Sequence, residues 1–153
     1  MKLVVGENSY MTVDEANEIV EDNFFEDDTE YVTWKGLSEN DKSKVIYNGT
    51  KLIETLPFIG VQYPGYQKMK WPRLISLRYM ECPYDVKVAI LNQGLKDKEN
   101  YNKQETKLQE LGVKTYSIKG ASISFGDSLK GGQKLSNGVY STIFDTYLSK
   151  WVH

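Results

Sequence analysis

The residues that could do chemistry are concentrated in one aromatic and basic stretch, YPGYQKMKWPR, at residues 63–73. Aromatic side chains that alternate with cations can stack on unpaired bases and follow a phosphate backbone. The candidate contact set for a single nucleic-acid strand is therefore Tyr66, Lys68, Trp71 and Arg73. The same pattern also fits a covering loop in which Trp71 fills the core and the cations are solvated. The net charge of −2 favours this structural interpretation.

Catalytic and metal chemistry find no support in the sequence. The stretch GDSLKGGQK, which starts at Gly126, superficially resembles a phosphate-binding loop. That motif requires lysine followed by serine or threonine where Gly132 and Gln133 stand. A single histidine, His153, and a single cysteine, Cys82, argue against a zinc cluster and against a Ser–His or Cys–His pair. We expect no enzymatic activity, no cofactor and no metal.

Length and composition are those of an ordinary globular domain. The chain has 153 residues, of which 40% are hydrophobic and 26% charged, and a chain of this length can bury about 70% of its unfolded surface. We therefore expect one domain spanning residues 1–153. The N-terminal MKLVVGENSY has too short an apolar run for a secretory signal, and no stretch has the roughly 20 apolar residues of a membrane span. These features predict synthesis inside the cell and no membrane partner.

Helical periodicity predicts a mainly α fold, a small bundle of about four helices with one inserted β-hairpin. Two helix starts are marked by capping patterns, Thr12 with Glu15 and Ser38 with Asp41. Pro57 ends the second helix, because proline disfavours helical geometry in the residue before it. The predicted helices span residues 12–23, 38–56, 83–112 and 137–152, and loops are expected at 24–34 and 59–73.

The predicted hairpin lies at residues 114–126 and is two-faced. A turn at Lys119-Gly120 would place alternate residues on one apolar face, including Tyr116, Ile118, Ile123 and Phe125. An isolated hairpin leaves two unpaired edges. These edges could pair with another copy of the chain or be shielded by the glycine-rich loop at 126–138, and we treat both segments as assembly elements.

The last predicted helix carries an apolar stripe that is wider than packing against its own bundle requires. We therefore hypothesise that it packs both its own bundle and a neighbouring protein. The candidate subunit or partner interface therefore has two parts. One is the apolar face of the hairpin, and the other, on this helix, consists of Tyr140, Phe144, Tyr147 and Trp151.

Several motifs occur in a specific order along the chain. Asn8-Ser9-Tyr10 precedes the first predicted helix, Gln67 precedes Trp71-Pro72-Arg73, and Pro83 opens the third helix. This order resembles that of the head–tail adaptor (connector) proteins of long-tailed double-stranded DNA phages, including the subset described as DnaT-like single-stranded-DNA-binding proteins. The long polar stretch at 96–109 departs from many of these relatives and puts the length of the third helix in question.

The resemblance implies a structural virion component made in the host bacterial cytoplasm and placed at the virion neck. Such a protein would form a dodecameric ring under the portal protein, dock a stopper or tail-completion protein, and extend the channel for genomic double-stranded DNA. Two alternatives stay open: a single-stranded-DNA-binding module that uses Tyr66, Lys68, Trp71 and Arg73, and a tail-completion or assembly factor.

Overall fold

The computed structural model describes residues 1–110, 134–135 and 138–153. These residues form a mainly helical fold with a small three-stranded antiparallel sheet, which confirms the predicted fold class. The helices are α1 (Val13–Asn23), α2 (Thr29–Lys35), α3 (Glu39–Ile53), α4 (Tyr84–Glu110) and α5 (Ser141–Ile143), and α5 continues through a π-helical turn (Phe144–Leu148) and a 3₁₀ turn (Ser149–Trp151). The strands are β1 (Val61–Gln62), β2 (Arg73–Ile75) and β3 (Arg78–Met80).

The predicted hairpin at 114–126, with its face of Tyr116, Ile118, Ile123 and Phe125, lies outside the described residues, as does most of the loop predicted at 126–138. No helix in the described part of the chain is long and apolar enough to cross a membrane.

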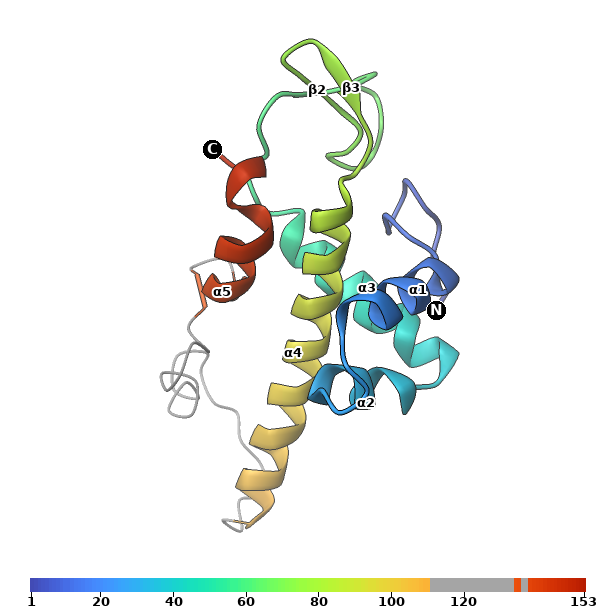
Figure 1. Cartoon of the computed structure of the whole chain (residues 1–153), viewed down its shortest axis with the longest axis vertical. Coiled ribbons are helices and arrows are strands. Elements are labelled where there is room, and N and C mark those ends of the chain that lie inside the picture. Colours follow the sequence, from blue (N-terminus) through green and yellow to red (C-terminus); the bar gives the residue numbers. More distant parts are fainter. Residues whose placement is uncertain (111–133, 136–137) are drawn as a thin grey trace.

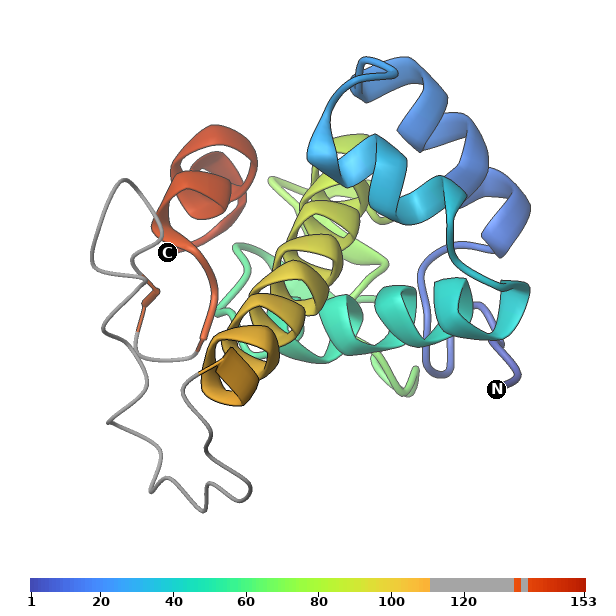
Figure 2. The same cartoon turned by 90° about the horizontal axis from the view of Figure 1, so that it is seen from below.

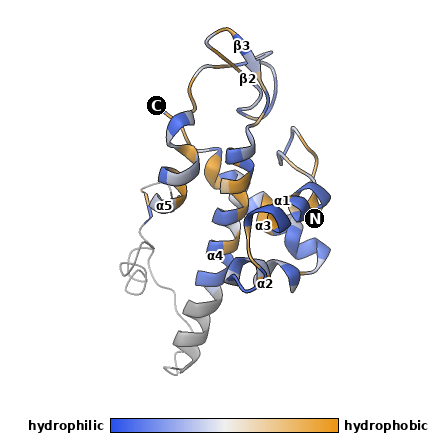
Figure 3. Ribbon diagram, in the orientation of Figure 1, coloured by the Kyte–Doolittle hydropathy of each residue, from blue (hydrophilic) through white to orange (hydrophobic). Residues whose placement is uncertain are grey.

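The long helix α4 is the centre of the fold. Figure 1 shows α1 and α2 on one side of α4, the C-terminal helix on the other and α3 passing across α4, with the β2–β3 hairpin projecting beyond the start of α4. Figure 2, seen from below, shows α3 crossing α4 rather than running alongside it. The first half of α4 carries several hydrophobic positions (Figure 3). The core therefore forms around that half of the helix.

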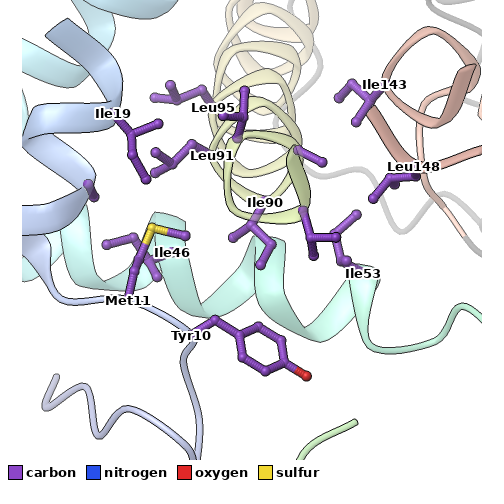
Figure 4. Packing of buried hydrophobic residues seen from close by; sticks show 14 of the residues in the cluster. Tyr10, Met11, Ile19, Ile46, Ile53, Ile90, Leu91, Leu95, Ile143 and Leu148 are labelled. Carbon is purple, nitrogen blue, oxygen red and sulfur yellow. The ribbon is translucent and has the colours of Figure 1, made fainter. Parts of the chain in front are cut away.

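The core joins residues from distant parts of the sequence. Ile90, Leu91 and Leu95 of α4 are fully buried, and α3 contributes Ile46 and Ile53. Figure 4 shows these side chains converging with others from α1 and from the C-terminal helix. The predicted apolar stripes of these helices thus face one shared interior.

The two predicted helix starts are confirmed. The Thr12 hydroxyl accepts a hydrogen bond from the backbone N–H of Glu15 at 3.1 Å, and the Ser38 hydroxyl accepts one from Asp41 at 3.2 Å. Each cap satisfies a backbone donor that the first helical turn leaves without a partner. Local sequence chemistry therefore sets where α1 and α3 begin.

The prediction of a loop at residues 24–34 is wrong, because α2 occupies most of it. Its anchor is Trp34, which is fully buried and donates its indole N–H to Asn17 Oδ1 at 2.9 Å. The Asp28 carboxylate accepts from the Phe25 N–H at 2.8 Å and turns the chain into the helix. Tertiary packing of one tryptophan thus stabilises a helix too short to show clear periodicity.

The prediction of a loop at residues 59–73 is also wrong in part, since β1 and the start of β2 lie within it. The register pairs Val61 with Leu74, and Leu74 with Tyr79. Strands β2 and β3 are joined by Ser76 and Leu77, both at positive φ, 50° and 64°. A two-residue hairpin turn of this kind normally carries asparagine or glycine, so its sequence signal is absent here.

The C-terminal helix begins at Ser141 rather than at the predicted residue 137. After it, the chain pairs with the segment that follows α3, since the Ile59 N–H donates to the Trp151 carbonyl at 2.9 Å and the His153 N–H to the Pro57 carbonyl at 3.1 Å. The end of the described chain is therefore tied to the base of the sheet.

Buried Gln93 attaches this C-terminal segment to α4. Its side-chain carbonyl accepts from the Tyr140 N–H at 3.0 Å, while its amide donates to the Gly138 carbonyl at 3.1 Å and to Asp97 Oδ2 at 3.0 Å. Gln93 is fully buried, and its bond to the Tyr140 N–H forms in a buried environment where an unpaired group is costly.

Replacing Gln93 with methionine should lower the free energy of unfolding by about 2 kcal/mol, because the buried Tyr140 N–H and the Gly138 carbonyl lose their partner. Methionine nearly preserves the side-chain volume, so a cavity does not explain the loss. Urea denaturation followed by circular dichroism measures the change. An unchanged unfolding midpoint would show that the amide is dispensable.

Candidate nucleic-acid interface

The residues predicted on the C-terminal helix pack mainly into their own core. Tyr140 is buried, and Phe144, Tyr147 and Trp151 are half-buried against the same cluster. The Trp151 ring lies edge-on to Trp71, with 6.0 Å between ring centroids. Part of Phe144, Tyr147 and Trp151 remains accessible, so the interface predicted on this helix stays a prediction.

Trp71 is structural in this conformation. Its side chain is 2% exposed and packs edge-on against Phe58 as well as Trp151, with 5.3 Å between the Phe58 and Trp71 centroids. Its backbone N–H donates to the hydroxyl of Tyr10 at 3.2 Å. Such a ring has no free face on which a base could stack.

Arg73 is also turned inward and is 8% exposed. Its guanidinium donates to four backbone carbonyls at 2.8–3.1 Å, those of Phe58, Ile59, Gly60 and Lys70. Burial lowers the pKa of this guanidinium from its ordinary value, and the negative charge of Glu54 opposes the change. Arg73 therefore organises the segment between α3 and β2 around one cation.

Tyr66 and Lys68 lie on the surface, as the nucleic-acid hypothesis requires. Tyr66 is 88% exposed. The Lys68 side chain is 68% exposed, and its ammonium lies 3.3 Å from Glu7 Oε1. The structure thus places two of the four predicted contact residues at the surface and two in the interior.

Two further exposed aromatic residues belong to this region, Tyr63 directly after β1 and Tyr79 on β3. Tyr63 and Tyr79 are about half exposed and form an edge-to-face pair with centroids 6.1 Å apart. Tyr79 and the exposed Arg78 escaped the sequence analysis, because they lie on β3, which was not predicted. Leu77, at the hairpin tip, is 94% exposed. We call β1, β2, β3 and the connecting residues 63–72 the sheet end.

A shallow depression of about 730 Å³ lies at the sheet end. Three cations line it, Lys68, Lys70 and Arg73, together with His153 and one acid, Glu54. The Lys70 ammonium donates to the Leu56 carbonyl at 2.7 Å, and Arg73 is occupied by its carbonyls. Lys68 is therefore the lining cation most open to an incoming phosphate.

The motif residues Tyr10 and Gln67 support this surface from within. The Tyr10 hydroxyl donates to the Glu54 carboxylate, and burial together with Glu54 raises the pKa of Tyr10. Gln67 donates to the Pro72 carbonyl at 2.8 Å and accepts from the Gly65 N–H at 2.7 Å. These motif residues therefore shape the loop rather than offer free reactive groups.

Among residues 1–110, 134–135 and 138–153, no group of three or more histidine, cysteine, aspartate or glutamate side chains is arranged to hold a metal ion. The sheet end instead carries exposed tyrosine rings and, on one face of the sheet, a lysine-lined depression.

Comparison with known proteins gives one result at the level of the family. The model of a family described as "Putative DnaT-like ssDNA binding protein" matches residues 2–148. No curated protein and no solved structure gives a significant match. Because the family match spans nearly the whole chain, this protein belongs to the DnaT-like family.

Proposed function

We propose that this protein binds single-stranded DNA at its sheet end. The observation that carries the proposal is that three exposed tyrosines, Tyr63, Tyr66 and Tyr79, lie on the sheet end, the same part of the fold that holds the depression lined by Lys68. The description of the family supports the same function. The contact set that we propose keeps Tyr66 and Lys68 and gives Trp71 and Arg73 a supporting role.

Stacking supplies most of the affinity in this proposal. Every base has a π-face, so exposed rings bind a strand with little dependence on sequence. The edge-to-face pair of Tyr63 and Tyr79 holds both rings in place, which reduces the entropy lost when a base stacks on them. A duplex keeps its bases stacked inside and cannot use these rings. The protein should therefore prefer single strands to duplex DNA.

Replacing Tyr66 with alanine should weaken the binding of a labelled single-stranded oligonucleotide about ten-fold, since one base–aromatic stack is lost. Fluorescence anisotropy at constant salt measures the change. Phe25→Ala is the matched control, because Phe25 is 78% exposed but lies between α1 and α2. Equal affinities for both variants and the native protein would exclude Tyr66 as a contact, and absence of binding by the native protein at low salt would refute the function.

Replacing Lys68 with alanine should reduce the slope of log K against log salt by about 0.7, the value for one phosphate contact on a single strand. Lys44→Ala is the control, because Lys44 is also an exposed lysine paired with an acid, Asp41, but it lies on α3. Titrations at several salt concentrations give both slopes. If the two variants have the same slope as the native protein, no phosphate contacts Lys68.

We propose, as a second candidate, the adaptor function that the family resemblance implies, including self-assembly and docking between a portal and a stopper or tail-completion protein. The exposed apolar side chains of the projecting hairpin, above all Leu77, favour a protein contact there (Figure 1). Co-purification of the Leu77→Ser variant with a portal protein tests it. Equal recovery of variant and native protein would exclude the hairpin tip as the contact.

A further inference from the structure

A second cavity borders the same segment, on the other face of the sheet. Arg73 pairs with Met80 and Leu74 with Tyr79, so Arg73 and Tyr79 point to opposite faces. The lysine-lined depression lies on the Arg73 face. The second cavity, about 250 Å³, is lined by Tyr79, Trp71 and Pro72, and by residues of the N-terminal segment, α1 and α4.

The volume and walls of this cavity suit one planar ring. Drug-sized ligands occupy roughly 300–1,000 Å³, so a cavity of this volume takes something smaller. Tyr79 and Pro72 provide flat apolar surface. Burial raises the pKa of the Cys82 thiol, which also lines the cavity, so that group is neutral at physiological pH. These walls are unfavourable for a phosphate and favourable for an uncharged aromatic ring.

The polar groups of the cavity define which edge of a ring would be recognised. Lys87 is already paired, since its ammonium donates to Glu15 Oε1 at 2.5 Å. Glu81 is exposed, lines the cavity and forms no hydrogen bond or ion pair with the described residues. An ionised carboxylate only accepts hydrogen bonds. The cavity is thus lined by the paired side chains of Glu15 and Lys87 and by the Glu81 carboxylate, which can accept a hydrogen bond from a ligand.

We propose that this cavity receives one nucleobase of the bound strand and favours a base with an exocyclic amine over thymine. The amine of cytosine donates to Glu81, whereas thymine presents a carbonyl at the same position, which the carboxylate repels. This inference rests on the proposed function. A cationic side chain from a protein partner is the alternative occupant, because two carboxylates, Glu15 and Glu81, and only one ammonium, Lys87, line the cavity.

The test is an anisotropy titration of the full chain with labelled oligo(dC) and oligo(dT) of equal length at one salt concentration. The native protein should bind oligo(dC) about five-fold more tightly, as expected for a specific contact to a base edge. In Glu81→Gln the ratio of the two affinities should fall close to one. Glu7→Gln removes the same charge next to Lys68, outside the cavity, so it should tighten both complexes and leave the ratio unchanged.

The outcomes separate the two proposals. Equal affinities of the native protein for both oligonucleotides, or a ratio that survives Glu81→Gln, would overturn the cavity inference and leave single-stranded-DNA binding intact. Failure to bind either oligonucleotide would overturn both. Calorimetric binding of N-acetylargininamide that is lost in Glu81→Gln, without any preference for oligo(dC), would assign the cavity to a cationic side chain and also overturn the inference.

Discussion

Replacing Gly94 with alanine should lower the free energy of unfolding by about 2 kcal/mol, although alanine is the better helix former. A Cβ atom at Gly94 would lie 2.4 Å from the Val45 carbonyl oxygen, far inside van der Waals contact. The obstacle is the backbone of α3, which cannot rotate away as a side chain can. The two helices would have to separate, and the core around Leu91 and Leu95 would loosen.

The contact is reciprocal, which makes a double variant informative. Gly49 on α3 faces α4 in the same way, and a Cβ there would lie 2.2 Å from the Ile90 carbonyl oxygen. Gly49→Ala alone should lower the free energy of unfolding by a similar amount. The double variant Gly49→Ala/Gly94→Ala should cost less than the sum, because the first methyl group already separates the helices.

Gly36→Ala is the matched control for this prediction. Gly36 caps α2 with ordinary helical dihedrals, and a Cβ there would meet the Val32 carbonyl oxygen at an ordinary 3.5 Å. This substitution should be neutral or slightly stabilising, since alanine restricts the unfolded chain. Urea denaturation of all variants gives the free energies. If Gly94→Ala is as stable as Gly36→Ala, α3 and α4 can move apart at this contact without loss of stability.

The helices that were predicted correctly are those with strong local signals. Thr12 and Ser38 mark starts through hydrogen bonds within four residues, and such signals do not depend on the rest of the fold. By contrast, α2 depends on the contact between Trp34 and Asn17, which are brought together only by folding. A seven-residue helix has too few positions for periodicity to reveal it.

The sheet was missed for a related reason. Its strands have two or three residues each, so alternation cannot be recognised. Ser76 and Leu77 both adopt positive φ, a conformation that their side chains disfavour. The sequence has no glycine or asparagine at these positions from which such a turn could be predicted. The turn is held by strand pairing on both sides, and that pairing is a tertiary property.

The candidate interface could be located from the sequence but not resolved residue by residue. The stretch 63–73 was identified from its mixture of tyrosine, tryptophan and cations. Irregular backbone has no fixed period, so nothing in the sequence tells which side chains face outward. Tyr66 is exposed and Trp71 is buried, yet each stands close to a proline and a cation. Only the fold distinguishes their roles.

Replacing Arg73 with methionine should have the largest effect on the sheet end, lowering the free energy of unfolding by about 3 kcal/mol. Four backbone carbonyls lose a charge-assisted donor at once, and those of Phe58 and Gly60 belong to the chain that leads into β1. The free energy of unfolding of Arg73→Lys should lie between those of Arg73→Met and the native protein, because an ammonium cannot reproduce the planar fork of a guanidinium.

Arg78→Met is the control for Arg73→Met. Arg78 lies on the neighbouring strand β3 but is exposed, so its loss should change the free energy of unfolding by less than about 0.5 kcal/mol. Chemical denaturation followed by tryptophan fluorescence suits the comparison, because Trp71 packs beside this segment. Equal stabilities of the two methionine variants would show that solvent replaces the guanidinium without cost.

The same pair of variants connects stability to function. Tyr66 and Lys68 lie between β1 and β2, and the Arg73 guanidinium binds the carbonyls of Ile59 and Lys70 on both sides of them. Arg73→Met should therefore weaken single-stranded-DNA binding even at temperatures where circular dichroism shows the helices intact, because the rings are no longer held in place. Retention of native affinity by such a folded variant would mean that the strand is bound by residues outside this loop.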